Sequence, residues 1–111
     1  MDVQIKNVDD VIVVAVSGEI DGKTAPEAQN VILPLVEPGS KLLVDMSEVP
    51  YMSSAGLRMM LLIYRQVSAN DGQSVLVGLS EELKDTMEVT GFLNYFEVRD
   101  TYDAGLQALA S

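Results

Sequence analysis

Two adjacent serines in the middle of the chain are the side chains best suited to carry chemistry. Ser53 and Ser54 lie in the segment Tyr51-Met52-Ser53-Ser54-Ala55-Gly56-Leu57-Arg58, where a loop is expected to lead into a helix. The first N–H groups of a helix lack internal partners and carry partial positive charge. A phosphoryl group on a serine adds about −1.5 to −2 charges, which such a helix end can accommodate. The segment therefore allows a phosphorylation site, and a plain helix cap is the alternative.

The composition excludes much other chemistry. The chain has no cysteine and no histidine, which argues against thiolate catalysis, disulfides, zinc sites and ordinary hydrolases. We expect no catalytic residue, metal site or cofactor. Seven basic against seventeen acidic residues give a formal net charge of −10. This charge repels nucleic acids and anionic lipids, so we expect neither as a partner, and we expect a soluble monomer when the protein is free.

The N-terminus has no signal-peptide pattern, and the longest nearly apolar run, residues 59–64, is too short to cross a bilayer. We therefore expect a cytoplasmic protein in which residues 1–111 form one complete domain. Strand and helix patterns alternate along it, which predicts an α/β fold. The expected sheet is mixed but mostly parallel, with about five strands, an N-terminal antiparallel hairpin and about four helices. The predicted strands are 2–6, 11–16, 41–45, 74–78 and 94–99, and the predicted helices are 24–34, 54–70, 80–90 and 101–110.

Local signals refine these elements. Thr24 is expected to cap the first helix, with Glu27 completing a capping box, and Pro34 is expected to end or kink that helix. Ser80 and Thr101 are expected to cap two later helices, and Gly91 is the candidate C-cap of the third. The buried stripe of the first helix is predicted to be Ala28, Val31, Ile32 and Leu35.

The helix at 54–70 has one broad apolar arc and one mixed face. Arg58, Leu62 and Arg65 line the mixed face, with Met59 beside them. Basic side chains with exposed apolar neighbours suit a protein partner, and a solvated helix face is the alternative. The arc predicted to face the core is Leu57, Met60, Leu61, Ile63, Tyr64 and Val67.

Three motifs together resemble the STAS superfamily, and bacterial anti-sigma-factor antagonists in particular. The serine segment follows the strand Leu42-Leu43-Val44-Asp45-Met46-Ser47, as the family's signature does. Gly18-Glu19-Ile20-Asp21 with Thr24-Ala25 is similar to a second family motif, and Gly91-Phe92 is similar to a third. The order of elements also agrees, so the resemblance covers essentially the whole chain.

The resemblance implies a partner-switching cycle. An unphosphorylated antagonist of this family binds an anti-sigma factor that is also a serine kinase of the GHKL type, and the sigma factor is released. The kinase then phosphorylates the motif serine, which matches Ser54, and a PP2C-type phosphatase restores it. Many family members have Asp before this serine. Here that residue is Ser53, which becomes an alternative phosphorylation site.

The same resemblance, together with the mixed helix face, gives the expected partner surface. Asp21 and Thr24 are expected to flank the serines, because loops after neighbouring parallel strands converge at one edge of the sheet. The whole set is Asp21, Thr24, Ser53, Ser54, Ala55, Gly56, Leu57, Arg58, Met59, Leu62 and Arg65. Gly56 is expected to leave room for another backbone to approach.

Other functions are also compatible with the sequence. A STAS fold also suits a subunit of a transport or lipid-trafficking assembly, or a regulator of a signalling output other than a sigma factor. The strand–helix order would permit a phosphate site near Gly56, but no Walker lysine or GxGxxG motif stands there. An enzyme or nucleotide binder is therefore the least favoured class.

Overall fold

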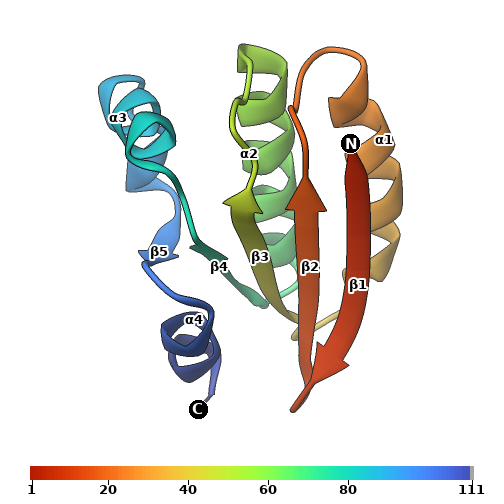
Figure 1. The fold of residues 1–111 in the computed structure, drawn as a ribbon. Helices are drawn as coiled ribbons and strands as arrows, with labels where there is room; N and C mark the ends of the chain where they lie inside the picture. The colour runs from red at the N-terminus through yellow and green to blue at the C-terminus, as the bar shows by residue number, and fades with distance from the viewer. Residues whose placement is uncertain (111) are drawn as a thin grey trace.

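The computed structural model describes residues 1–110 and forms a five-stranded mixed sheet with helices on both faces (Figure 1). The strands follow chain order across the sheet; β1 and β2 are antiparallel, and every other neighbouring pair is parallel. This confirms the predicted fold class. The strands are β1 (Asp2–Val8), β2 (Val11–Ser17), β3 (Lys41–Glu48), β4 (Gln73–Val77) and β5 (Glu97–Arg99). The helices are α1 (Thr24–Ile32), α2 (Ser54–Ala69), α3 (Glu81–Val89) and α4 (Tyr102–Leu109).

The hairpin turn is shorter than the sequence pattern indicated. β1 continues to Val8, which pairs with Val11, so Asp9 and Asp10 alone make the turn. Both have positive φ, 49° and 69°, as the central residues of a type I′ hairpin turn require. Aspartate tolerates this conformation better than most residues, which explains why the two acidic residues stand there.

The first helix departs from its predicted core stripe. It ends at Ile32, and Pro34 lies in a short 3-10 turn, Leu33–Leu35, which confirms the predicted helix end. Val31, however, is 41% exposed, so its predicted burial is wrong. Ala25 is buried in its place, because the helix is rotated so that Ala25, Ala28 and Ile32 face the sheet side.

The last strand is also shorter than predicted. Residues Phe92–Asn94 form a 3-10 turn after Gly91, and only Glu97–Arg99 pair with β4. The backbone N–H of Asn94 donates to the Gly91 carbonyl at 3.2 Å, so it serves this turn instead of the sheet. Gly91 has φ +80°, which agrees with its predicted role at the end of α3.

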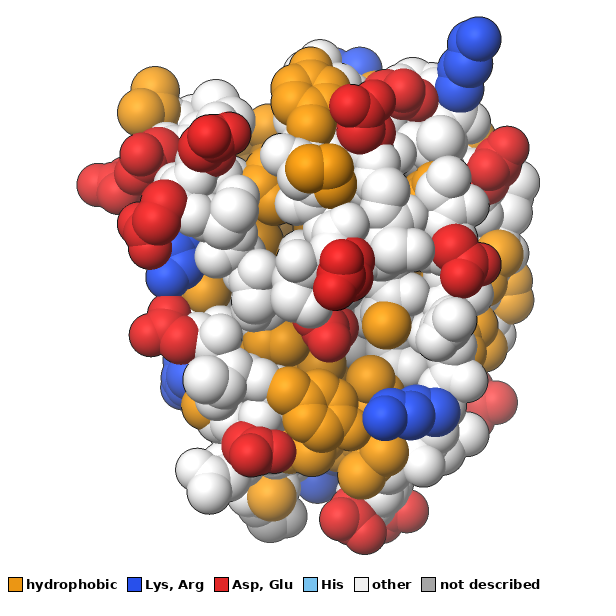
Figure 2. Space-filling view, in the orientation of Figure 1, with side chains coloured by type: hydrophobic (Ala, Val, Ile, Leu, Met, Phe, Trp, Pro, Cys, Tyr) orange, Lys and Arg blue, Asp and Glu red, His pale blue; other side chains and the backbone are white. Residues whose placement is uncertain are grey.

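Two apolar layers hold the sheet between its helices. On one face the core joins the sheet to α1, α2 and α3, with Val14, Val44 and Leu76 among its buried members. On the other face a smaller cluster around Leu43 and Leu109 receives α4 alone. The face that carries α4 shows scattered acidic side chains and an apolar patch in its lower part (Figure 2).

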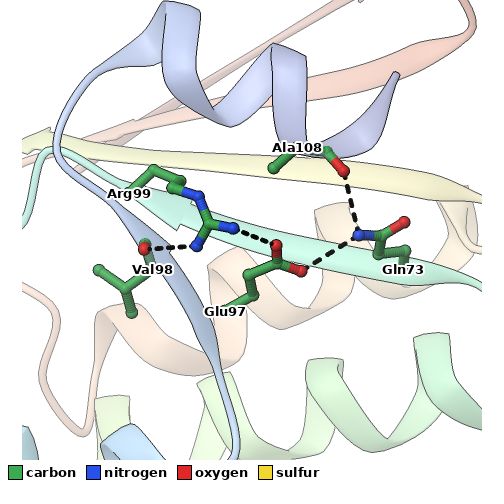
Figure 3. Close-up of polar contacts among 5 residues, drawn as sticks. All are labelled: Gln73, Glu97, Val98, Arg99 and Ala108. Carbon is green, nitrogen blue, oxygen red and sulfur yellow. Dashed lines mark hydrogen bonds and ion pairs between the residues drawn. The ribbon is translucent and has the colours of Figure 1, made fainter. Parts of the chain in front are cut away.

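A polar link ties α4 to the far edge of the sheet (Figure 3). The Gln73 side-chain amide donates to Glu97 Oε1 at 3.1 Å and to the Ala108 carbonyl at 3.2 Å. Arg99 Nη2 pairs with Glu97 Oε2 at 2.8 Å. The link holds β4, β5 and α4 together, although β5 has only three residues.

Candidate functional site

The candidate site lies where the loops after β2 and β3 meet, at the upper end of the sheet in Figure 1. The Ile20 N–H donates to the Tyr51 carbonyl at 3.0 Å, and the Ser53 N–H donates back to the Ile20 carbonyl at 2.8 Å. Ile20 is fully buried beneath this contact. Backbone hydrogen bonds therefore join the two loops that carry the predicted motifs, as expected for loops that follow neighbouring parallel strands.

Asp21 and Thr24 use their polar atoms within their own loop. Asp21 Oδ1 accepts from the Lys23 N–H at 2.9 Å and the Thr24 N–H at 3.0 Å. Thr24 Oγ1 accepts from the Asp21 N–H and donates to the Glu19 carbonyl. The N-cap position is Lys23, whose side chain makes no cap bond, so the predicted cap role of Thr24 is wrong. Asp21 instead accepts from the N–H groups of the N-cap residue and of the first helix residue, because its carboxylate reaches two and three residues ahead.

These two backbone donors hold the pKa of Asp21 below its ordinary value of 3.8. The carboxylate therefore stabilises the folded state above the unfolded-state pKa, and this contribution is lost as the pH falls through the lower folded-state pKa. In an NMR titration of the Asp21 side-chain carboxyl, we expect a lower midpoint in native protein than in urea-unfolded protein. An equal or higher native midpoint would show that the loop bonds do not hold the charged form.

Ser53 and Ser54 differ in how their hydroxyls are used. Ser53 is the N-cap of α2, is partly buried, and its Oγ accepts from the Gly56 N–H at 3.5 Å. Ser54 is the first residue of α2 and is exposed. Within residues 1–110, no hydrogen bond engages the Ser54 hydroxyl. Ser54 therefore presents an accessible oxygen at the helix N-terminus, and the cap function belongs to Ser53.

Gly56 is packed inside the chain and does not lie on a surface. A Cβ added there would overlap Met52 Cγ, and it would lie 2.9 Å from Ile20 Cγ2 and 3.2 Å from the Ile20 carbonyl oxygen. The backbone that approaches Gly56 is thus this protein's own β2–α1 loop. Its predicted place on the partner surface is wrong, because that loop occupies the space the glycine leaves.

This packing predicts that Gly56→Ala destabilises the fold by about 1–3 kcal/mol, since the new methyl overpacks the junction of the two loops. The gain of up to about 1 kcal/mol in helix propensity offsets only the lower end of this range, so a net loss is expected. Urea unfolding monitored by circular dichroism measures the change. The matched control is Gly22→Ala in the same loop region, where nothing lies within 4 Å of the added Cβ. A Gly56→Ala protein as stable as this control would contradict the packing.

An open groove of about 330 Å³ begins at the serines. Tyr51, Ser53 and Ser54 line it from the β3–α2 loop and the start of α2, and Leu57 lines it from within α2. Helix α3 and its C-cap residue supply side chains that the sequence analysis did not single out: Glu82, Leu83, Thr86 and Thr90. Three of these recur at intervals of four, so the helical period would have grouped them, but nothing in the sequence placed α3 beside α2.

The outer face of α2 extends from this groove. Arg58, Leu62 and Arg65 are exposed, as predicted, and Leu62 retains 40% of its surface. Met59 is only 3% exposed, so its predicted place beside them is wrong. Helix α2 packs against α1 as well as the sheet, which widens its buried arc to include Met59. Leu57 is also buried, which confirms its predicted place on the core arc, and Ala55 is partly exposed.

The groups around Ser54 determine whether the site could accommodate the negative charge of a phosphoryl group. The first turn of α2 holds no acidic residue, so its free N–H groups face no competing carboxylate within the helix. Arg58 follows Ser54 by four residues, which places both on the same side of the helix. Glu82 lies across the groove. The site can therefore hold a doubly negative group while changing the charge that it presents to a partner.

Within residues 1–110, no group of three or more acidic side chains is placed to hold a metal ion. Across the same residues, no helix has the length and apolar character needed to cross a membrane.

Comparison with known proteins places this geometry in a family. Residues 2–105 match the STAS domain. The anti-sigma-B factor antagonist of Bacillus subtilis is 30% identical over 107 residues, covering 96% of this chain and 98% of that one. The anti-sigma-B factor antagonist of Listeria monocytogenes is 34% identical over 100 residues, covering 88% of each. A crystal structure of an anti-sigma factor antagonist from Mycobacterium paratuberculosis is 29% identical, has a TM-score of 0.87, and aligns over 99% of this chain and 94% of that one. The chain belongs to the STAS domain family, and proteins named as anti-sigma factor antagonists are among its relatives.

Proposed function

We propose that this protein is an anti-sigma-factor antagonist whose partner binding is switched off by phosphorylation of Ser54. In its unmodified form it binds an anti-sigma factor that is also a serine kinase of the GHKL type, and so releases a sigma factor. A PP2C-type phosphatase returns it to the binding form. The protein is a substrate and ligand in this cycle and works in the cytoplasm; ATP and the catalytic groups belong to the kinase.

The observation that carries the proposal is the exposed, unengaged hydroxyl of Ser54 at the N-terminus of α2. A kinase needs access to this oxygen, and the fold does not use it for a contact. The positive end of α2 and Arg58 favour an added negative group, so modification need not damage the domain. The relatives named as antagonists support the class of partner.

The structure gives a physical reason to prefer Ser54 over Ser53. Ser53 is partly buried, and its oxygen accepts from the Gly56 N–H as the helix cap. Attaching phosphate there would disturb the cap, which is worth about 0.5–2 kcal/mol. Ser54 has no such role. The loss of the aspartate that many family members carry before the phosphorylated serine is consistent with Ser53 acting here as the cap.

The proposed partner surface combines the groove and the outer face of α2. Tyr51 is 53% exposed at the groove, and Leu62 is 40% exposed further along α2. Exposed apolar side chains beside Arg58 and Arg65 suit a protein surface that carries acidic groups. Ser54 lies between the groove and this helix face, so a phosphate there would meet the partner directly.

Mass spectrometry after incubation with ATP and the anti-sigma factor kinase of the same organism tests the proposal. We expect one phosphoryl group per chain, on Ser54, and no modification of the Ser54→Ala variant. Ser53→Ala is the matched control and should still be modified. Phosphate on Ser53 in the unaltered protein would move the switch to the cap residue, and no phosphate on either serine would refute the proposal.

A further inference from the structure

The outer edge of β1 is a free strand edge. β1 pairs with β2 on one side, and no strand or helix within residues 1–110 pairs with its other side. It is seven residues long, has no proline or glycine, and four of its five central residues are exposed. Such an edge presents unpaired N–H and C=O groups that can pair with another strand.

The hairpin determines which backbone groups point outward. Val8 and Val11 flank the two-residue turn and form its closing hydrogen-bonded pair. Because backbone direction alternates along a strand, Lys6, Gln4 and Asp2 also direct their N–H and C=O groups toward β2. Val3 and Ile5 therefore direct theirs to the outer edge.

We propose that a second copy of this chain pairs with this edge, β1 antiparallel to β1, with Gln4 on the two-fold axis. In this register Asp2 lies opposite the partner's Lys6, twice by symmetry, and Val3 lies opposite the partner's Ile5. Val3 and Ile5 carry the outward backbone groups, so they make the hydrogen-bonded pairs. Shifting the register by two residues in either direction loses both charge pairs, so the side chains select this one.

Several features of the strand support a second copy as the occupant. Asp2 and Lys6 lie on the same face of β1, because strand side chains alternate. Neither takes part in an ion pair among the described residues. Lys6 makes only a cation–π contact, 5.3 Å from the Tyr102 ring centroid. Ile5, on the opposite face, is 41% exposed, and pairing would cover part of it.

The proposed dimer leaves the Ser54 site open. The two sheets would join into one of ten strands. The two-fold axis would place the loops after β2 and β3 of the two copies at opposite ends of this sheet. Each copy could therefore bind a partner by itself. An edge-only contact is small, and each copy carries a net charge of −10, so we expect a weak dimer that forms at high protein concentration.

A charge exchange tests the pairing by sedimentation equilibrium at concentrations up to about 1 mM, where even weak dimers are populated. We expect the unaltered protein to approach twice the monomer mass. Asp2→Lys and Lys6→Asp alone should each remain monomeric, because each places like charges opposite each other. An equimolar mixture of the two should regain the dimer, since both cross-pairs are then opposite in charge, and the double variant should regain it too.

The Asp2→Lys variant also distinguishes the specific charge pairs from general repulsion between two negatively charged copies. It lowers the net negative charge, so general repulsion alone would predict stronger association. Lys23→Asp is the control, since it changes net charge as Lys6→Asp does but lies in the β2–α1 loop. It should keep the dimer. A monomer at every concentration, or a dimer unaffected by the charge exchange, would overturn the proposal.

Cysteine cross-linking tests the register in a chain that has no cysteine of its own. Gln4→Cys should oxidise to a disulfide dimer, because the two Cα atoms would lie about 4.5 Å apart across a non-hydrogen-bonded pair. Ile5→Cys should not, since its two Cα atoms would lie about 8–9 Å apart, beyond disulfide reach. Cross-linking of Ile5→Cys in preference to Gln4→Cys would contradict the register.

Discussion

Ser54→Glu is expected to weaken binding to the anti-sigma factor by roughly 100-fold or more, which corresponds to about 3 kcal/mol. The carboxylate would stand at the start of α2, between the groove and the exposed face of the helix. An unpaired charge at a contact that excludes water carries a penalty of this size. Isothermal titration calorimetry or surface plasmon resonance with the purified anti-sigma factor measures the change.

The fold should not suffer from the same substitution. An acidic side chain in the first turn of a helix stabilises it by about 0.3–1 kcal/mol, so Ser54→Glu should unfold no more easily than the unaltered protein. Ser54→Ala should keep its affinity. The matched control is Ser68→Glu, an exposed serine on the same helix about 21 Å further along. If Ser68→Glu reduced affinity as much as Ser54→Glu, the effect would be one of net charge and not of the site.

Met59→Ala is expected to lower the free energy of unfolding by about 2–5 kcal/mol, as for other large-to-small substitutions in cores. Met59 is 3% exposed and belongs to the core that joins α1 and α2 to the sheet. Leu62, three residues further along, is 40% exposed. Leu62→Ala should change stability by no more than about 1 kcal/mol, because little of a packed environment is lost.

For partner binding, we expect Leu62→Ala to have the larger effect and Met59→Ala the smaller one. Leu62→Ala should weaken binding to the anti-sigma factor by about tenfold, or about 1.4 kcal/mol, if Leu62 is part of the contact. Met59→Ala, measured under conditions where it remains folded, should bind nearly as well as the unaltered protein. Urea unfolding and calorimetry on the two variants provide both values. A Met59→Ala protein of normal stability would place Met59 on the surface after all.

The sheet and the position of the serines could be predicted from sequence because each rests on a local pattern. The β-branched run at 11–16 indicates a strand covered on both faces, and the structure buries most of it. The serines stand directly before a long apolar-periodic segment, where a helix start is expected. The family resemblance added what no single pattern contains, namely that a serine at this helix start can be a switch.

The edges of the buried arc of α2 could not be predicted, because the middle of this helix is apolar almost all the way round. Residues 59–63 are all apolar, so several arcs of the helix fit a core equally well. The structure turns the buried arc toward Gly56 and Met59, leaving Leu61 only partly covered. Packing against α1 decides where the buried arc ends, and that is a tertiary contact.

The groove and the roles of Asp21 and Thr24 were missed for a similar reason. Glu82 and Thr86 look like an ordinary solvated helix face until α3 is seen beside the start of α2. Thr24 followed three residues later by Glu27 fits the capping-box pattern, but the helix already begins at Thr24, and Asp21 accepts from the Thr24 N–H. A carboxylate three residues before a helix start is the signal that could have been used.

In the proposed mechanism, phosphate on Ser54 switches partner binding without unfolding the domain. The most direct test is to prepare protein phosphorylated only at Ser54 and to measure its affinity for the anti-sigma factor beside its thermal unfolding. We expect a loss of affinity of about 100-fold or more with an unfolding temperature that does not fall. Equal affinity of the two forms, or loss of binding accompanied by loss of the fold, would contradict the account.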